Sequence, residues 1–287
     1  MASLRDIRRR IRSVKNVAQI TKAMETVAAS RLRRAQERVL ASRPFVTKLE
    51  EVLSNLADVT LDETPPLLAK RPVTNGALLL VTPNRGLAGS LIGNLNRHAA
   101  RFLLDQHDVS TEIIAVGRKG RDFMARNLQR LAAEFLAVPD RPSLDDVVPI
   151  ARVIIDGYVN GQFDRVSLVY SQFVSTLVQR PATKQLLPIE PPDSDERRGL
   201  RDFIYEPNAA EVLNQLLPRY VETIVYQAVL ENMASFYAAQ MVAMRNATDN
   251  ANEVVGDLTL TYNKVRQATI TREITEISAG AEALANA

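Results

Sequence analysis

The chain contains no cysteine and no tryptophan. Without cysteine it forms no disulfide, and it offers neither a thiolate nucleophile nor a thiolate ligand for a metal. Histidine is nearly absent as well, since only His98 and His107 occur. Both fall where we expect the outer side of a surface helix and its following turn. We therefore expect solvated side chains there, in preference to ligands or general bases.

Long apolar runs are also missing. None approaches the roughly 20 residues that a helix needs to cross a bilayer. Residues 1–12 are too basic and too poor in apolar side chains for a signal sequence. These two absences predict a water-soluble chain.

Positive charge is concentrated at the N-terminus. The chain has 287 residues and a net charge of only +3. Residues 1–43 hold twelve lysines and arginines against three acids, so this segment carries about +9 and should seek an acidic surface. A basic coiled coil that binds nucleic acid is therefore an alternative function. The near absence of aromatic residues and the spread of arginines around the helix disfavour it.

Apolar residues from Ser3 to Leu56 recur with the seven-residue spacing that is typical of a coiled-coil helix. Two seam positions, Thr21 and Glu25, are polar. We expect either that the partner helix departs there or that this face meets something polar. The two seams consist of Leu4, Ile11, Ala18, Glu25, Leu32, Val39, Val46 and Leu53, and of Ile7, Val14, Thr21, Ala28, Ala35, Ser42, Leu49 and Leu56.

A second long helix is predicted from the boundary at Pro207 and Asn208 to the C-terminus. Two helices that each carry one apolar stripe bury those stripes most simply as an antiparallel pair. The C-terminal helix is the longer, so its last turns should lack a helical partner in the same chain. Its seam consists of Ala251, Val255, Leu258, Tyr262, Val265 and Thr269, and then of Ile270, Ile274, Ile277, Ala281 and Leu284.

The middle of the chain has the pattern of a layered α/β domain. Apolar runs alternate with helical stretches, and Pro181 and Pro188 favour an edge position for the last strand. The fold class is thus α/β plus long α: a coiled-coil helix at 1–58, an inserted α/β domain at 73–190 and a coiled-coil helix at 208–287. The expected strands are 76–82, 112–116, 166–170 and 175–187, and the expected helices are 90–104, 118–131 and 144–158.

Candidate chemistry in this domain is weak. Gly86, Gly89 and Gly93 follow the first strand, but their spacing is not the dinucleotide fingerprint and no Lys-Ser/Thr follows them. A tight turn is the preferred interpretation and a nucleotide site the alternative. The segment 117–120 is either an anion site on a helix N-terminus or, preferably, a solvated turn.

Paired acids give no better evidence for an enzyme. Asp145 and Asp146 open a predicted helix, and the acids at 193–196 lie in a polar loop; neither pair resembles acid–base machinery. We therefore predict a mechanical or interaction role with no catalytic, cofactor or metal residues. An enzyme built on the α/β domain remains the third class of function.

Four segments resemble the gamma-subunit family of F-type ATP synthases. They are ITKAMETVAASRL at 20–32, RGLAG at 85–89, MVAMRNATDNA at 241–251 and YNKVRQATITREITEISAGA at 262–281. The likeness extends over nearly the whole chain, in the order that the family has.

The resemblance implies a non-catalytic rotor shaft that couples ion flow to ATP synthesis or hydrolysis. It implies a head of alternating regulatory (alpha) and catalytic (beta) subunits, an epsilon-type small stalk subunit and a membrane c-ring as partners, with one copy of this chain per complex and no nucleic acid. The expected location is the cytoplasmic face of a bacterial inner membrane, as a peripheral membrane protein. The start at Met1, with no leader before it, favours the bacterial origin.

The resemblance also implies subunit-interaction residues. Lys22, Ala23 and Met24 match the segment that passes the acidic lever region of a catalytic subunit, which would account for the polar seam beside it. A second group meets loops of the catalytic subunits in the family. For each polar residue the alternative is a solvated flank of the coiled coil. The second group consists of Arg266, Gln267, Thr271 and Glu273.

Overall fold

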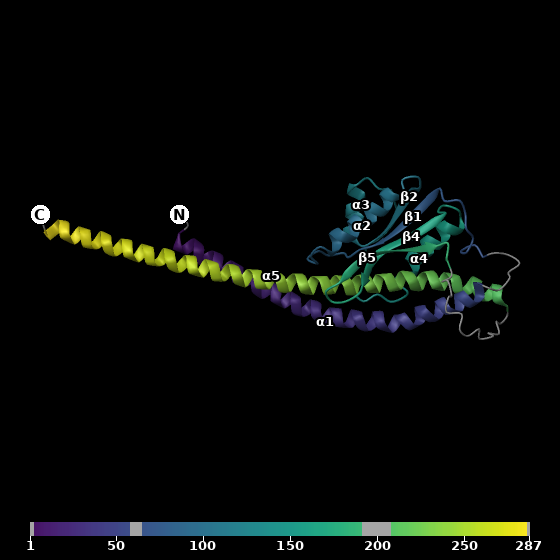
Figure 1. Ribbon diagram of the computed structural model, residues 1–287, viewed down its shortest axis with the longest axis horizontal. Coiled ribbons are helices and arrows are strands. Elements are labelled where there is room, and N and C mark those ends of the chain that lie inside the picture. The colour runs from purple at the N-terminus through teal and green to yellow at the C-terminus, as the bar shows by residue number, and fades with distance from the viewer. Residues whose placement is uncertain (1–2, 58–64, 191–207, 286–287) are drawn as a thin grey trace. The chain divides into compact units, whose positions relative to one another are not determined.

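The computed structural model describes residues 3–57, 65–190 and 208–285. Its two long helices are α1, Leu4–Ala57, and α5, Ala209–Ala285 (Figure 1). The chain divides into two compact units, one of residues 1–28 with 241–287 and the other of residues 29–240. Predictions that concern residues 193–196, Pro207 and the side chain of Leu284 lie outside the described part.

The two helices pair antiparallel within each unit. In the first unit Arg8 contacts Tyr262, whereas Thr21, farther along α1, contacts Thr248. In the second unit Ser42 bonds to Gln227. None of the sixteen expected seam residues of α1 is exposed. The antiparallel pair is therefore confirmed.

The second unit also contains a five-stranded sheet in the order β3-β2-β1-β4-β5. Strands β1 to β4 are parallel to their neighbours, and β5 is antiparallel to β4 at the edge, as expected. The parallel strands carry near-continuous apolar runs because both faces of the sheet are covered. The strands are β1 (Asn75–Val81), β2 (Ser110–Val116), β3 (Leu131–Phe135), β4 (Arg165–Phe173) and β5 (Gln179–Leu187).

Each face of the sheet packs against its own helices. Leu78 and Leu80 point to a cluster with α2, Leu91–Asp105, and α3, Arg118–Arg126. Leu79 and Val81 join a larger core with α4, Val148–Val159, and with residues 49–56 of α1 and 213–229 of α5. Figure 1 shows α2 and α3 on the side of the sheet away from α5. The long helices thus supply one layer of the α/β domain.

The predicted class, α/β plus long α, is confirmed, but the helix expected at 118–131 is wrong in its second half. It ends at Arg126, and residues 131–135 form β3 beside β2. The backbone turns at Leu128, whose φ is +56° and whose side chain is 91% exposed. A leucine rarely adopts this conformation, and Leu-Ala-Ala-Glu favours helix, so the local sequence gave no sign of the strand.

The expected start of the third helix, at 144, is also wrong, because α4 begins at Val148. Asp145 and Asp146 therefore precede the helix instead of opening it. The carboxylate of Asp146 accepts hydrogen bonds from the backbone N–H of Ser143, at 2.7 Å, and from its hydroxyl, at 2.8 Å. These bonds lower the pKa of Asp146 and fix a turn.

The shared core gives a first prediction. Leu79→Ala removes a fully buried side chain between the sheet and the long helices and should lower the free energy of unfolding by about 2–5 kcal/mol. Leu104→Ala is the control, since this side chain is 75% exposed and should change stability by at most about 0.5 kcal/mol. Urea denaturation of the full chain measures both. Equal midpoints for the two variants would contradict the shared core.

Candidate functional site

The loop after β1 and the N-terminus of α3 meet at the carboxyl end of the parallel strands. In α/β folds this edge is where ligands bind. Here the first turn of α3 is already occupied by the chain's own loop. The N–H of Arg118 donates to Oδ1 of Asn84 at 3.0 Å, and the N–H of Gly120 donates to Oγ1 of Thr82 at 2.8 Å. The N–H of Lys119 donates to the carbonyl of Pro83 at 3.2 Å.

The glycines of this edge serve close packing. Gly117 has a φ of +93°, and a Cβ there would lie 2.0 Å from the carbonyl oxygen of Thr82. A Cβ at Gly120 would lie 2.7 Å from Cγ2 of the same threonine, whereas one at Gly86 would meet nothing within 4 Å. The preferred tight turn after β1 fits this geometry. The N–H donors of 118–120 are satisfied within the chain, which counts against the anion site. In the turn itself Arg118 is exposed, whereas Gly117 and Gly120 are buried.

The polar seam of the helical pair has its partners within the chain. Oγ1 of Thr21 lies 2.7 Å from Oγ1 of Thr248. One carboxylate oxygen of Glu25 accepts a hydrogen bond from Nε of Arg245, and the other accepts one from Nζ of Lys22, both at 3.0 Å. We expected either that the partner helix departs here or that this face meets a polar group. The second expectation is confirmed, because the face meets Thr248 and Arg245 of α5. No partner subunit is needed to explain the seam.

The residues singled out as subunit contacts lie on both helices of the first unit. Lys22 and Ala23 are exposed and Met24 is half-buried. The structure does not bring the two groups together. Thr248, which lies opposite the first group, is 18 residues from Arg266, or about 27 Å along a helix. All four residues of the second group are exposed: Arg266, Gln267, Thr271 and Glu273.

The end of α5 lacks a partner helix within its unit. Tyr262 is the last described residue of α5 whose side chain is hydrogen-bonded to α1, through Arg8. Every described side chain from Ile270 to Ala281 is exposed, and Ile270, Ile274 and Ile277 are 47%, 59% and 72% exposed. The expected lone apolar tip is confirmed. An apolar stripe of this kind is usually covered by another protein.

Comparison with known proteins gives the family. A sequence model of the family described as ATP synthase matches residues 3–284. The ATP synthase gamma chain of Roseiflexus castenholzii is 55% identical over 289 residues, which cover 99% of each chain. That of Dehalococcoides mccartyi is 50% identical over 287 residues, which cover 99% of this chain and 100% of the relative. The chain belongs to the ATP synthase gamma chain family.

Solved structures agree on the fold. A chain of the Euglena gracilis mitochondrial ATP synthase, in an assembly of OSCP, F1 and c-ring, superposes with a TM-score of 0.68 at 23% identity. The match covers 98% of this chain and 94% of that one. A gamma chain is a non-catalytic stalk subunit, so the prediction that the chain is not an enzyme is confirmed by its family. The nucleic-acid alternative finds no support in these relatives.

No helix within 3–57, 65–190 or 208–285 combines the length and apolar character that a bilayer crossing needs.

The buried carboxylate of Glu25 makes the helical pair sensitive to acid. Its hydrogen bonds from Lys22, and then from Arg245, hold the pKa of Glu25 below its ordinary value, although burial opposes this effect. A group whose pKa is lowered on folding stabilises the folded state above its unfolded pKa. That contribution is lost as the pH falls through the folded pKa.

We therefore predict that Glu25→Gln destabilises the chain at neutral pH and flattens its loss of stability on acidification. Glu37→Gln is the control, because Glu37 forms an exposed ion pair with Arg33. Exposed ion pairs contribute little to folding stability. Urea denaturation followed by circular dichroism, from neutral to acid pH, measures the difference. If the stability of the wild type and that of Glu25→Gln fell in parallel with pH, the contacts of Glu25 would make no contribution to the pH dependence of stability.

Proposed function

We propose that the chain is the central-stalk rotor subunit of a bacterial F-type ATP synthase, which transmits torque between an ion-driven membrane ring and the catalytic head. The observation that carries the proposal is the full-length match to bacterial gamma chains at 50% identity or more. The helices then serve as the shaft. ATP and its Mg²⁺ are bound by the neighbouring catalytic subunits.

The structure supplies a route for torque. In the second unit one continuous core contains residues of the sheet, of α4 and of both long helices. Turning the α/β part therefore turns α1 and α5 with it, because close-packed interiors transmit strain. In the first unit the bonds from Glu25 to Arg245 and from Thr21 to Thr248 resist sliding of one helix along the other.

We propose as partners the alternating alpha and beta subunits of the head, an epsilon-type stalk subunit and the membrane c-ring, with one copy of this chain per complex. The chain then lies at the cytoplasmic face of the inner membrane as a peripheral protein.

We also propose the division into a coiled-coil helix at 1–58, an inserted α/β domain at 73–190 and a coiled-coil helix at 208–287. The bounds of α1, β1 to β5 and α5 support this division.

Two groups of residues are proposed to contact the head. Lys22, Ala23 and Met24 would pass the acidic lever region of a catalytic subunit. Their position on an outer face of the helical pair supports this role. The side chains of the second group make no hydrogen bond or ion pair with any described residue, so they are available to loops of the catalytic subunits. This group consists of Arg266, Gln267, Thr271 and Glu273.

Rotation predicts that a covalent link stops the machine. The chain has no cysteine, so Lys22→Cys introduces its only thiol. Paired with a cysteine in the acidic lever region of one beta subunit, it should form a disulfide where the Cα atoms come within about 4.4–6.8 Å. Each ion that crosses the membrane delivers only about 2.3 kcal/mol per charge per 100 mV. This energy is far less than the energy needed to break a covalent disulfide bond. We expect oxidation to stop ATP synthesis and hydrolysis and a reductant to restore both.

The control complex carries Lys22→Cys without the second cysteine and should keep its activity under the same oxidant. ATPase and synthesis assays on complexes whose cross-linking is quantified by electrophoresis decide the result. Multi-turnover activity in a fully cross-linked complex would refute rotation of this part of the chain.

The lone tip of α5 should matter for coupling. Truncation after Ala268 removes Ile270, Ile274 and Ile277, whose exposed stripe has no cover in the first unit. We expect weaker assembly and poorer coupling of hydrolysis to ion transport, while the α/β domain stays folded.

The control for the truncation is Arg272→Gln with Glu276→Gln, which removes an exposed ion pair from the same segment and leaves the apolar stripe intact. Ion pumping and ATPase rates of purified complexes measure the effect. A truncated chain that assembles and couples like the full-length chain would show that the tip is needed neither for assembly nor for coupling.

A further inference from the structure

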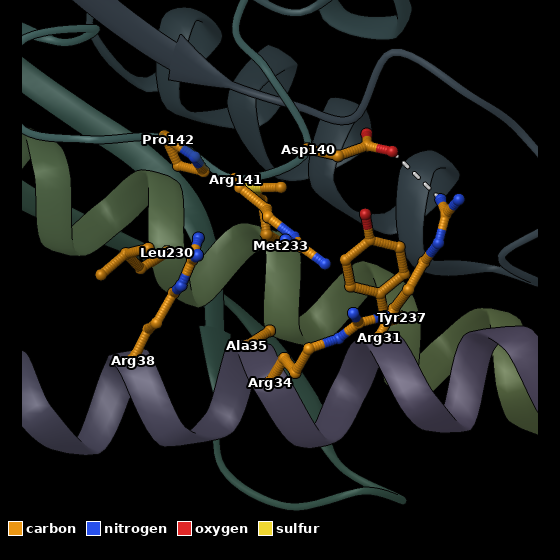
Figure 2. Close-up of a pocket in the computed structure, with 10 residues that line it drawn as sticks. All are labelled: Arg31, Arg34, Ala35, Arg38, Asp140, Arg141, Pro142, Leu230, Met233 and Tyr237. Carbon is orange, nitrogen blue, oxygen red and sulfur yellow. Dashed lines mark hydrogen bonds and ion pairs between the residues drawn. The ribbon is translucent and has the colours of Figure 1, made fainter.

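A basic pocket lies between α1, α5 and the loop that joins β3 to α4, entirely within the second unit. Its volume is about 160 Å³, more than ten times the roughly 10–15 Å³ that one water needs. Figure 2 shows arginines rising from α1 while Arg141 reaches toward them from the loop. The pocket is lined by Arg31, Arg34, Ala35, Arg38, Asp140, Arg141, Pro142, Leu230, Met233 and Tyr237.

The charges of this pocket are not balanced by the chain. Its one acid, Asp140, is already shared by two guanidinium groups, that of Arg31 at 3.1 Å and that of Arg85 at 3.3 Å. Arg34 reaches only the hydroxyl of Ser30, at 3.4 Å. Arg34, Arg38 and Arg141 make no ion pair with any residue in the described ranges. Three guanidinium groups therefore surround one cavity without an acidic partner.

Such a cluster favours an anion. Like charges around a half-enclosed cavity repel one another, and an anion among them removes that repulsion. All four cations of the pocket are arginines, whose planar forks match the oxygen pairs of phosphate better than a lysine does. Leu230, Met233 and Pro142 form an apolar wall, whereas Arg34 and Arg141 are exposed and Arg38 is half-buried, so an anion can enter from solvent.

We propose that this basic pocket binds a small oxyanion of the phosphate class, held by Arg34, Arg38 and Arg141. The site adjoins the cavity at the edge of the sheet, with which it shares Asp140, Met233 and Tyr237. The three arginines line only the basic pocket, and at the edge the donors of α3 are already satisfied by the chain's own loop. Tyr237 adds a neutral donor to the wall. A tyrosine hydroxyl is protonated at neutral pH at its ordinary pKa, and burial raises the pKa of Tyr237 further.

The test is a calorimetric titration of the full-length chain with inorganic phosphate, at an ionic strength held constant with sodium chloride. We expect saturable binding of one phosphate with a dissociation constant on the order of 1 mM or lower. Arg141→Gln should weaken it about tenfold, as expected for the loss of one charge-assisted hydrogen bond. Arg38→Gln with Arg141→Gln should weaken it further.

Arg33→Gln is the matched control. Arg33 lies beside Arg34 on α1, is exposed and does not line the pocket, so it makes the same change of charge outside the site. Its variant should bind phosphate like the wild type. Equal weakening by Arg33→Gln and Arg141→Gln would overturn the proposal, because the attraction would then be diffuse.

A second titration with AMP distinguishes a nucleotide phosphate from the free ion. AMP that binds more tightly than phosphate and depends on Arg141 supports the site with a nucleotide as its source. AMP that binds no better than phosphate supports the free oxyanion.

A third titration uses an oligoglutamate peptide. No saturable binding of phosphate or AMP would overturn the proposal, and binding of the peptide alone would assign the pocket to protein carboxylates.

Discussion

The structure depends on one constraint, the burial of a single apolar stripe along α1 against α5. A helix with one such stripe is unstable alone in water. A mostly parallel sheet with apolar side chains on both faces is likewise unstable when one face is uncovered. The second unit meets both needs with one core, in which Leu53 and Leu56 of α1 and Val221 and Val225 of α5 pack against the inner face of the sheet. A helical rod and an α/β domain therefore move as one piece there.

The polar layer of the first unit favours one register of the two helices within that unit. An apolar seam alone tolerates sliding by a whole heptad, because each step brings similar side chains together. The Thr21–Thr248 contact and the Glu25–Arg245 ion pair match at one register only, since a slip would bury a carboxylate without its partners.

Most of the architecture followed from periodicity. The seven-residue spacing predicted both helices and the residues that α1 buries, and the alternation of apolar runs with helical stretches predicted four of the five strands. The missed strand, Leu131–Phe135, is made of helix-favouring residues and exists because Ile114 and Val116 of β2 offer it backbone partners. The partners of Thr21 and Glu25 on α5 could not be identified either, because Thr248 and Arg245 lie more than 200 residues away in the sequence.

The edge of the sheet explains how a ligand-binding fold is compatible with a mechanical role. In an open parallel sheet the carboxyl ends of the strands and the helix N-termini leave donors free for phosphate. Here Thr82, Pro83 and Asn84 satisfy those donors, and Gly117 and Gly120 allow the loop to pack directly on α3. A cavity of about 360 Å³ remains beside this edge, but the N–H donors that would hold a phosphate there are already bonded to the chain's own loop. Three guanidinium groups without an acidic partner in the described ranges, those of Arg34, Arg38 and Arg141, lie nearby, where the domain meets the two helices.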